Sequence, residues 1–244
     1  MKKIFLLSLL FAVLGCASEM PECLRNAGAA TRYQVDVEVF TQIEVSEGIE
    51  VVLIQGASYK VEIATRENLR SEISAVVADG KLVLRNSSSC NWVRDYNTTT
   101  VYITAPNITS IYSASQFAVR SSGVLSYPAL TLQSGLYNDT AAATFDLELD
   151  TDSLTVEDNG SSYFKISGRA DNLTVHFYSG DARFDGSSLL TQDLQVFHRS
   201  SNDIIAAPSQ TVSGTLYSTG NLVLKSHPAS VQVQRLYHGD VIYE

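Results

Sequence analysis

Basic residues, cysteine and histidine are scarce in this chain of 244 residues. Its 17 Lys and Arg residues are outnumbered by 26 Asp and Glu, which gives a formal net charge of -9. Nucleic-acid binding depends on positive charge that displaces counterions from phosphates, so this composition excludes a nucleic-acid partner. Three cysteines are too few for a disulfide-dense scaffold, and a hydrophobic content of 45% is too high for an acidic disordered chain.

Catalytic motifs are also missing. The sequence contains no Gly-x-Ser-x-Gly nucleophile turn, no Gly-Lys-Ser/Thr phosphate loop and no His-Glu-x-x-His zinc motif. The four histidines (His176, His198, His227 and His238) have no second ligand at zinc-binding spacing, and we interpret them as solvated residues on outer strand faces. The sequence therefore predicts no catalytic residue, no metal site and no cofactor.

The N-terminus has the pattern of a secretory signal. Two lysines precede an apolar run over residues 4–14, which is shorter than the roughly 20 residues that a membrane-spanning helix needs. The following Gly15-Cys16 completes a sequence that resembles a bacterial lipobox. This resemblance implies cleavage after residue 15 and lipidation of Cys16, and the alternative is an ordinary signal peptide that is cut a few residues later.

Three segments follow from this interpretation. Residues 1–15 are the lipoprotein signal peptide, residues 16–32 are a small, polar, aperiodic tether, and residues 33–244 are the folded domain. The predicted location is the cell envelope, with a lipid anchor in the outer membrane. In that oxidising compartment Cys23 and Cys90 are candidates for a disulfide, and two separate thiols are the alternative.

Alternation of apolar and polar residues dominates the chain from Tyr33 onward. Val35, Val37 and Val39 alternate with polar residues, and the same pattern recurs at several later segments, which predicts half-buried strands. Only residues 65–74 have a pattern compatible with a helical turn. The sequence thus predicts an all-β fold.

A repeat of about 20 residues appears in the second half of the chain. Leu154-Thr155-Val156, Leu173-Thr174-Val175 and Leu194-Gln195-Val196 begin 19 and 21 residues apart, and a Gly or Asx turn follows each of them. A unit of this length fits one turn of a single-stranded β-helix, that is, a β-solenoid. An antiparallel β-sandwich is the alternative, but the tight Asn-Gly hairpin signals that it needs are few.

The first half of the folded domain carries a recognisable series of residues: Phe40, Ile43, Val45, Gly48, Ile49, Val51, Leu53, Gln55-Gly56, Val61, Ile63, Asn68-Leu69, Ile73, Asp79-Gly80 and Leu82. Together with the run over residues 101–108, this series resembles the head-GIN domain family, labelled "putative auto-transporter adhesin". The resemblance extends over residues 38–244 and is strongest before 110. It implies a right-handed, β-helix-like fold in a lipoprotein of Gram-negative bacteria, and it supplies no catalytic residue because the family has no established activity.

Tyrosines near the predicted turns form the candidate ligand surface. Tyr178, Tyr217 and Tyr237 adjoin these turns, as Tyr163 does, and stacked tyrosines could hold sugar rings on their apolar plates; filler on the flank of the solenoid is the alternative. The turn residues themselves (Asp158, Asp181, Asn202, Asn221 and Asp240) are interpreted as structural, since Asp and Asn tolerate such corners. Thr140 and Ser153 resemble acceptor sites of bacterial O-glycosylation.

The leading functional hypothesis is a non-enzymatic, lipid-anchored envelope protein whose solenoid surface serves adhesion or ligand binding. Its partners would be the membrane, through the lipid, and a glycan or an envelope protein. One alternative is a carbohydrate-active β-helix enzyme, although Arg169, Arg183 and Arg199 are out of step with the repeat. The other is a subunit of an envelope assembly that docks through an open end of the solenoid.

Overall fold

The computed structural model describes residues 26–88, 99–137 and 141–244. Cys16, Cys23, Cys90 and Thr140 lie outside these ranges. Within them, no helix is both long and apolar enough to cross a membrane. The strands are β1 (Ala30–Val35), β2 (Gln42–Val45), β3 (Glu50–Gln55), β4 (Lys60–Arg66), β5 (Ile73–Ala78), β6 (Lys81–Asn86), β7 (Thr100–Ala105), β8 (Ser110–Ser113), β9 (Val119–Leu125), β10 (Ala129–Ser134), β11 (Thr144–Asp158), β12 (Tyr163–Phe177), β13 (Arg183–His198), β14 (Ile204–Leu216), β15 (Leu222–Leu224), β16 (Ser230–Arg235) and β17 (Val241–Tyr243).

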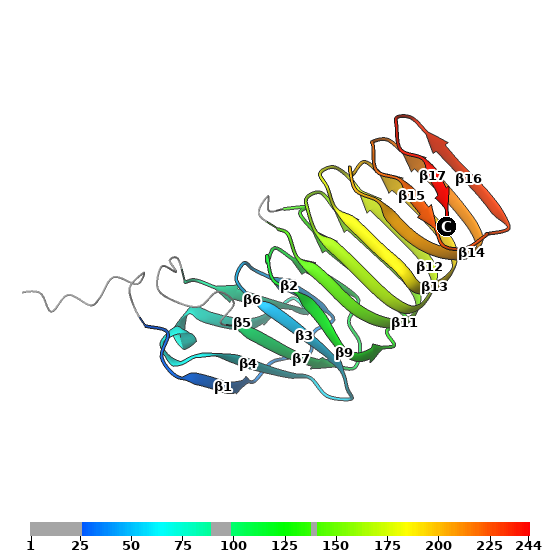
Figure 1. Cartoon of the computed structure of the whole chain (residues 1–244). Coiled ribbons are helices and arrows are strands. Elements are labelled where there is room, and N and C mark those ends of the chain that lie inside the picture. The colour runs from blue at the N-terminus through cyan, green and yellow to red at the C-terminus, as the bar shows by residue number, and fades with distance from the viewer. Residues whose placement is uncertain (1–25, 89–98, 138–140) are drawn as a thin grey trace, which may run out of the picture.

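The chain winds into a β-solenoid, and this confirms the fold predicted from the sequence. The long strands β11, β12, β13 and β14 stack in parallel, and Figure 1 shows them as successive coils along one axis. Val156 pairs with Val175, which pairs with Val196, and all three are buried. Residues about 20 apart in the sequence therefore lie one above another, and the antiparallel sandwich is excluded.

Two sheets form the walls of the solenoid, and the long strands bend from one into the other. The first sheet runs in the order β5, β6, β2, β8, β10, then the C-terminal halves of β11 to β14, and then β16. The second sheet runs β1, β4, β7, β3, β9, then the N-terminal halves of β11 to β14, β15 and β17. Residues that alternate inward along both sheets fill the core.

Strand order in the first half departs from chain order. β2 pairs with β6 on one side and with β8 on the other, and β3 lies in the same way between β7 and β9. The coil made by β6 and β7 is therefore placed outside the earlier coil made by β2 and β3. The chain then returns to the other side and continues the stack from β8.

Antiparallel strands close the N-terminal end. β1 pairs with β4, β4 with β7, and β5 with β6, all in antiparallel orientation. A short 3-10 helix, η2 (Glu67–Glu72), connects β4 and β5, and it falls within the segment expected to contain a helical turn. Because β1 begins at Ala30, the last residues of the proposed tether belong to this end of the sheet.

Aromatic stacking and one glycine show how tightly the coils pack. The rings of Phe145 and Phe164 are stacked with centroids 4.7 Å apart inside the solenoid. Gly214 follows Val196 in the inward valine column with φ of +133°, and a Cβ atom there would overlap the carbonyl oxygen of Val196. Only glycine allows this close approach between successive strands.

Turn residues at the corners bond to their neighbours, as the structural interpretation predicted. Asn202 Nδ2 donates to the carbonyl oxygen of Asp181 at 2.6 Å, and the backbone N–H of Asp240 donates to Asn221 Oδ1 at 3.0 Å. Among the residues that the structure describes, no group of three or more His, Cys, Asp or Glu side chains is arranged to hold a metal. The corner amides of Asn202 and Asn221 thus bond neighbouring coils to each other.

Candidate functional site

One outward column of the first sheet brings together the candidate binding residues. Strand register aligns Tyr112 of β8, Gln133 of β10, Glu157 of β11, His176 of β12 and Phe197 of β13. Each lies next to an inward residue, so its side chain is directed away from the core. We call this set the site column.

Three aromatic rings form an aromatic stripe at the C-terminal part of this column. The ring centroid of Phe197 lies 5.8 Å from that of Tyr178 and 4.7 Å from that of Tyr217. Tyr217 has an exposed fraction of 39%. The structure thus brings Tyr178 and Tyr217 together through Phe197, a residue that the sequence analysis had not singled out. Its outward position follows from the buried Val196 before it, and this alternation is the signal that could have identified it.

Glu157 is the polar centre of the site column. Tyr178 donates its hydroxyl proton to Glu157 Oε1 at 2.8 Å, and Gln133 Nε2 donates to Glu157 Oε2 at 2.7 Å. Burial and the adjacent Glu157 carboxylate raise the pKa of Tyr178 to about 12, so its hydroxyl stays protonated. These hydrogen bonds hold the Glu157 and Tyr178 side chains in place on the surface. The face of the Tyr178 ring stays available for packing against a ligand.

The remaining tyrosines occupy other surfaces. Leu236, rather than Tyr237, is equivalent to Tyr217 in the next coil, because its N–H donates to the carbonyl of Leu216 as that of Tyr217 donates to His198. The Tyr237 ring contacts His238, with centroids 4.2 Å apart. Tyr163 lies on the second sheet, where Arg183 lies over its ring at 5.2 Å.

Two titratable residues are buried among the inward residues of the first sheet. His198 was interpreted as solvated, but it is fully buried next to Phe177, and neither ring nitrogen has a partner with full hydrogen-bond geometry in the part of the chain that the structure describes. Its burial lowers its pKa to about 4, against a weaker opposing effect of Asp203. Asp158 is also fully buried, and burial raises its pKa to about 6. Neither side chain can contact a ligand on the outer surface.

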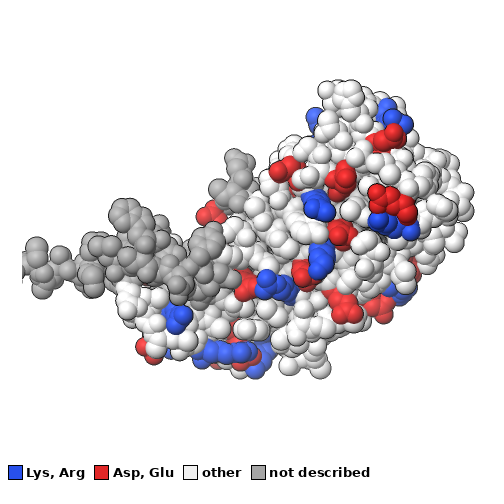
Figure 2. Space-filling model, viewed as in Figure 1, with Lys and Arg blue, Asp and Glu red and all other residues white. Residues whose placement is uncertain are grey.

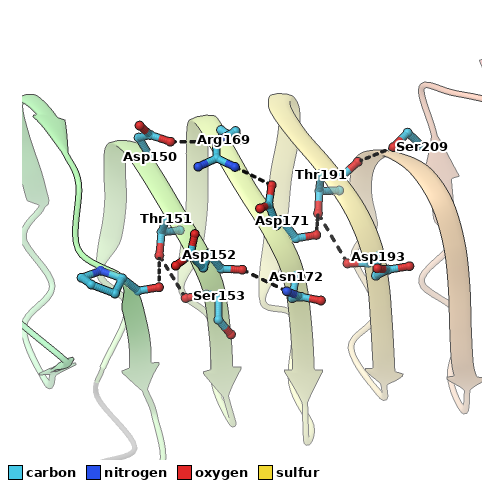
Figure 3. Close-up of polar contacts among 11 residues, drawn as sticks. Asp150, Thr151, Asp152, Ser153, Arg169, Asp171, Asn172, Thr191, Asp193 and Ser209 are labelled. Atoms are coloured by element: carbon cyan, nitrogen blue, oxygen red, sulfur yellow. Dashed lines mark hydrogen bonds and ion pairs between the residues drawn. The ribbon is translucent and has the colours of Figure 1, made fainter.

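Charged groups of both signs are interspersed on the face shown in Figure 2, with uncharged areas between them. Where the long strands bend between the two sheets, Arg169 of β12 pairs with Asp150 of the neighbouring β11 and with Asp171 of its own strand (Figure 3). Arg169 Nε donates to Asp150 Oδ1 at 2.8 Å and Arg169 Nη1 to Asp171 Oδ1 at 2.7 Å. An adjacent hollow of about 300 Å³ is lined by Leu190 and Arg169. Arg169 is already paired with the two aspartates. This bend is stabilised by its polar contacts.

Ser153 lies at this same bend (Figure 3), half-buried within the parallel ladder, where it pairs with Ala129 and Asn172. Its carbonyl oxygen accepts a hydrogen bond from Thr151 Oγ1 at 3.2 Å. Glycosylation of Ser153 and of Thr140 stays a prediction, as do the lipidation of Cys16 and the pairing of Cys23 with Cys90.

Known proteins share this architecture. A putative adhesin from Bacteroides fragilis superposes with a TM-score of 0.79 at 17% identity, over 88% of this chain and 97% of that one. A putative adhesin from Parabacteroides merdae gives a TM-score of 0.66 at 17% identity, over 89% and 97% of the two chains. A protein from Parabacteroides distasonis, described as a putative lipid binding protein, gives 0.64 at 11% identity, over 88% and 97%. At these identities the likeness concerns the fold.

No curated protein matches the chain in sequence. The family described as "Putative auto-transporter adhesin, head GIN domain" matches residues 39–228, which is most of the chain and includes the site column. The chain therefore belongs to the head GIN domain family.

Proposed function

We propose that this protein is a non-enzymatic, lipid-anchored component of the cell envelope that binds glycans through the aromatic stripe. The observation that carries the proposal is the contact of Tyr178, Phe197 and Tyr217 on one outward surface across three successive coils. The adhesin family supports a role at the envelope or cell surface.

Glycans fit the chemistry of this surface better than charged polymers do. Sugar rings present apolar C–H faces that pack on aromatic plates, while their hydroxyl groups bond to planar polar side chains. The aromatic stripe supplies the plates, and Gln133, Glu157 and His176 supply polar groups beside them. Strand pairing holds the backbone of Phe197, and backbone hydrogen bonds to the preceding coil hold those of Tyr178 and Tyr217, which limits the rearrangement before binding.

The anchor would place the binding surface away from the membrane. Figure 1 shows β1 and the antiparallel strands at one end of the stack and β16 with β17 at the other. Since the chain enters the fold at β1, a lipid on Cys16 would hold this first end next to the bilayer. Two or more acyl chains give stable anchoring.

The enzyme alternative requires two carboxylates that flank the scissile bond of a bound sugar, and a basic residue nearby to hold the substrate. Of the corner carboxylates, Asp158 is buried, whereas Asp181 is exposed. Arg169 pairs in register with Leu190, and Arg183 with Tyr163, so these arginines do not stack. The assembly alternative would use the C-terminal end, where Leu236, Tyr237 and Tyr243 are exposed.

A glycan array with the mature chain tests the proposal. We expect binding to neutral glycans that Phe197→Ala and Tyr217→Ala each weaken by about tenfold, as for aromatic residues at the centre of an interface. Tyr243→Ala is the matched control, since this exposed tyrosine lies at the end of the second sheet. Equal binding by all four proteins, or no binding at all, would contradict the proposal, provided that circular dichroism shows each of them folded.

A further inference from the structure

A hollow lies at the other end of the site column, where β2, β6, β8 and β10 adjoin. It measures about 430 Å³, which falls in the range of small-molecule sites. Its lining is mostly polar and comprises Gln42, Glu44, Lys81, Ser110, Tyr112, Gln133 and Tyr137, with Ile43. We call it the polar hollow.

The polar hollow combines aromatic and polar groups in one place. The Tyr112 and Tyr137 rings lie 5.3 Å apart, and Tyr137 is 81% exposed. Lys81 Nζ lies 3.2 Å from Glu44 Oε2, so among the described lining residues the one lysine is paired with the one carboxylate. A site of this composition favours an uncharged, polar ligand over an anionic one.

The hydroxyl oxygen of Tyr112 is buried beside Tyr137, whose backbone approaches it. It has no partner that meets the geometry of a full hydrogen bond among the described residues. Buried polar atoms without such a partner are rare in native proteins, and a ligand hydroxyl that reached this oxygen from the hollow would satisfy it. Burial raises the pKa of Tyr112, so the group can both donate and accept.

The polar hollow is continuous with the aromatic stripe. Tyr112 and Gln133 line the hollow and belong to the site column, and Gln133 bonds to Glu157, which in turn accepts from Tyr178. From β8 to β13 the column crosses β10, β11 and β12, so Tyr112 and Phe197 are four strand spacings apart, roughly 19 Å at about 4.8 Å each. This length exceeds a single sugar ring.

We propose that the polar hollow is a second saccharide subsite, and that the protein binds an extended neutral glycan chain that lies across the strands, along the solenoid axis, from Tyr137 to Tyr217. The inference rests on the proposed function and deepens it by naming the form of the ligand. One part of the chain occupies the polar hollow and another packs on the aromatic stripe. Linked contacts of this kind raise affinity steeply once a ligand reaches both sites.

Chain-length dependence tests this inference. Binding of chitin, mannan and xylan oligomers of increasing length is measured by calorimetry with the mature chain and with Tyr137→Ala, Phe197→Ala and Tyr243→Ala. For at least one series we expect affinity to rise until the oligomer spans both subsites. Tyr137→Ala and Phe197→Ala should each weaken the longest oligomers by about tenfold and abolish the gain with length, while Tyr243→Ala has no effect.

A second variant separates ligand binding from folding. Tyr112→Phe removes the hydroxyl and keeps the ring, so thermal stability should be unchanged or raised while long oligomers bind more weakly. If Phe197→Ala weakens binding but Tyr137→Ala and Tyr112→Phe do not, the subsite is refuted and the proposed function stands. If no oligomer in any series binds, or if Phe197→Ala is without effect, both the subsite and the proposed function are refuted.

Discussion

Two buried titratable side chains oppose each other in their effect on stability. Asp158 and His198 lie in the same inward column, on either side of Phe177. Burial raises the pKa of Asp158 to about 6 and lowers that of His198 to about 4, so both are held toward their neutral forms. Each therefore takes up or releases a proton when the protein unfolds, in opposite senses.

The signs of the two effects can be worked out separately. Between about pH 4 and 6 the unfolded chain loses the Asp158 proton that the folded protein keeps, so stability from this group falls as pH rises. As the pH drops from about 6.5 to 4, His198 becomes protonated in the unfolded chain but stays neutral in the folded protein. The stability contributed by this group therefore falls as pH drops. Since the two shifts have opposite signs and similar sizes, we expect the two slopes largely to cancel in the wild-type protein.

Substitution of either residue should make the pH dependence of stability due to the other measurable. Asp158→Asn removes the effect of Asp158, so its free energy of unfolding should fall by about 2–3 kcal/mol from pH 6.5 to 4. His198→Leu should show the reverse, with a loss of similar size as pH rises from 4 to 6. Urea denaturation at several pH values measures both variants. Parallel pH profiles for the two variants would show that these side chains do not titrate as the structure indicates.

Residue-level prediction from sequence succeeded where alternation was applied strictly. Val175 and Val196 are inward, so His176 is outward and His198, two residues after Val196, is inward. We placed both histidines on outer faces because histidine is polar. Strict alternation along the strand would have placed His198 on the inward face. The burial of a histidine without hydrogen-bond partners has no signal in residue type alone.

At the scale of secondary-structure elements, spacing between adjacent coils limits which residues a strand can hold. Gly214→Ala adds a Cβ against the Val196 carbonyl at a φ of +133°, and we expect the free energy of unfolding to fall by more than about 2 kcal/mol. Urea denaturation measures the loss.

Gly123→Ala is the matched control for Gly214→Ala. Gly123 has a φ of +88°, but no atom lies within 4 Å of its added Cβ. Only backbone strain of about 1–2 kcal/mol should result there. Equal losses in the two variants would show that the close approach of β13 and β14 contributes little.

The regular coils could be predicted from sequence, whereas the first half of the solenoid could not. Val156, Val175 and Val196 repeat with nearly constant spacing, so alternation and turn residues together specify which strands stack. Before residue 110 alternation identifies strands but not their partners. The insertion of β2 between β6 and β8 depends on long-range packing, and so does the antiparallel end at β1, β4 and β5.

The difference between local sequence pattern and long-range packing also explains which residues of the candidate site could be predicted. Tyr178 and Tyr217 were found because both adjoin turns, while Phe197 lies inside β13 and meets them only through strand register. The polar hollow combines Glu44 of β2, Lys81 of β6 and Tyr112 of β8, which no local pattern connects.

At the scale of the whole molecule, the solenoid would extend outward from the proposed lipid anchor. We expect the wild-type protein to fractionate with membranes and to carry acyl chains on Cys16 in intact mass spectra. Cys16→Ala removes the thiol that would be acylated, so the acyl mass should be absent from its spectrum. A wild-type protein without the acyl mass, or a Cys16→Ala protein that still carries it, would contradict the proposed anchor.

The central claim is that the site column binds one extended glycan. The most direct test is a crystal structure of the mature chain with the longest oligomer that binds. We expect the oligomer to cross β8, β10, β11, β12 and β13, with one sugar between Tyr112 and Tyr137 and another on Phe197. An oligomer bound along a single strand, on the second sheet or at the C-terminal end would contradict the claim.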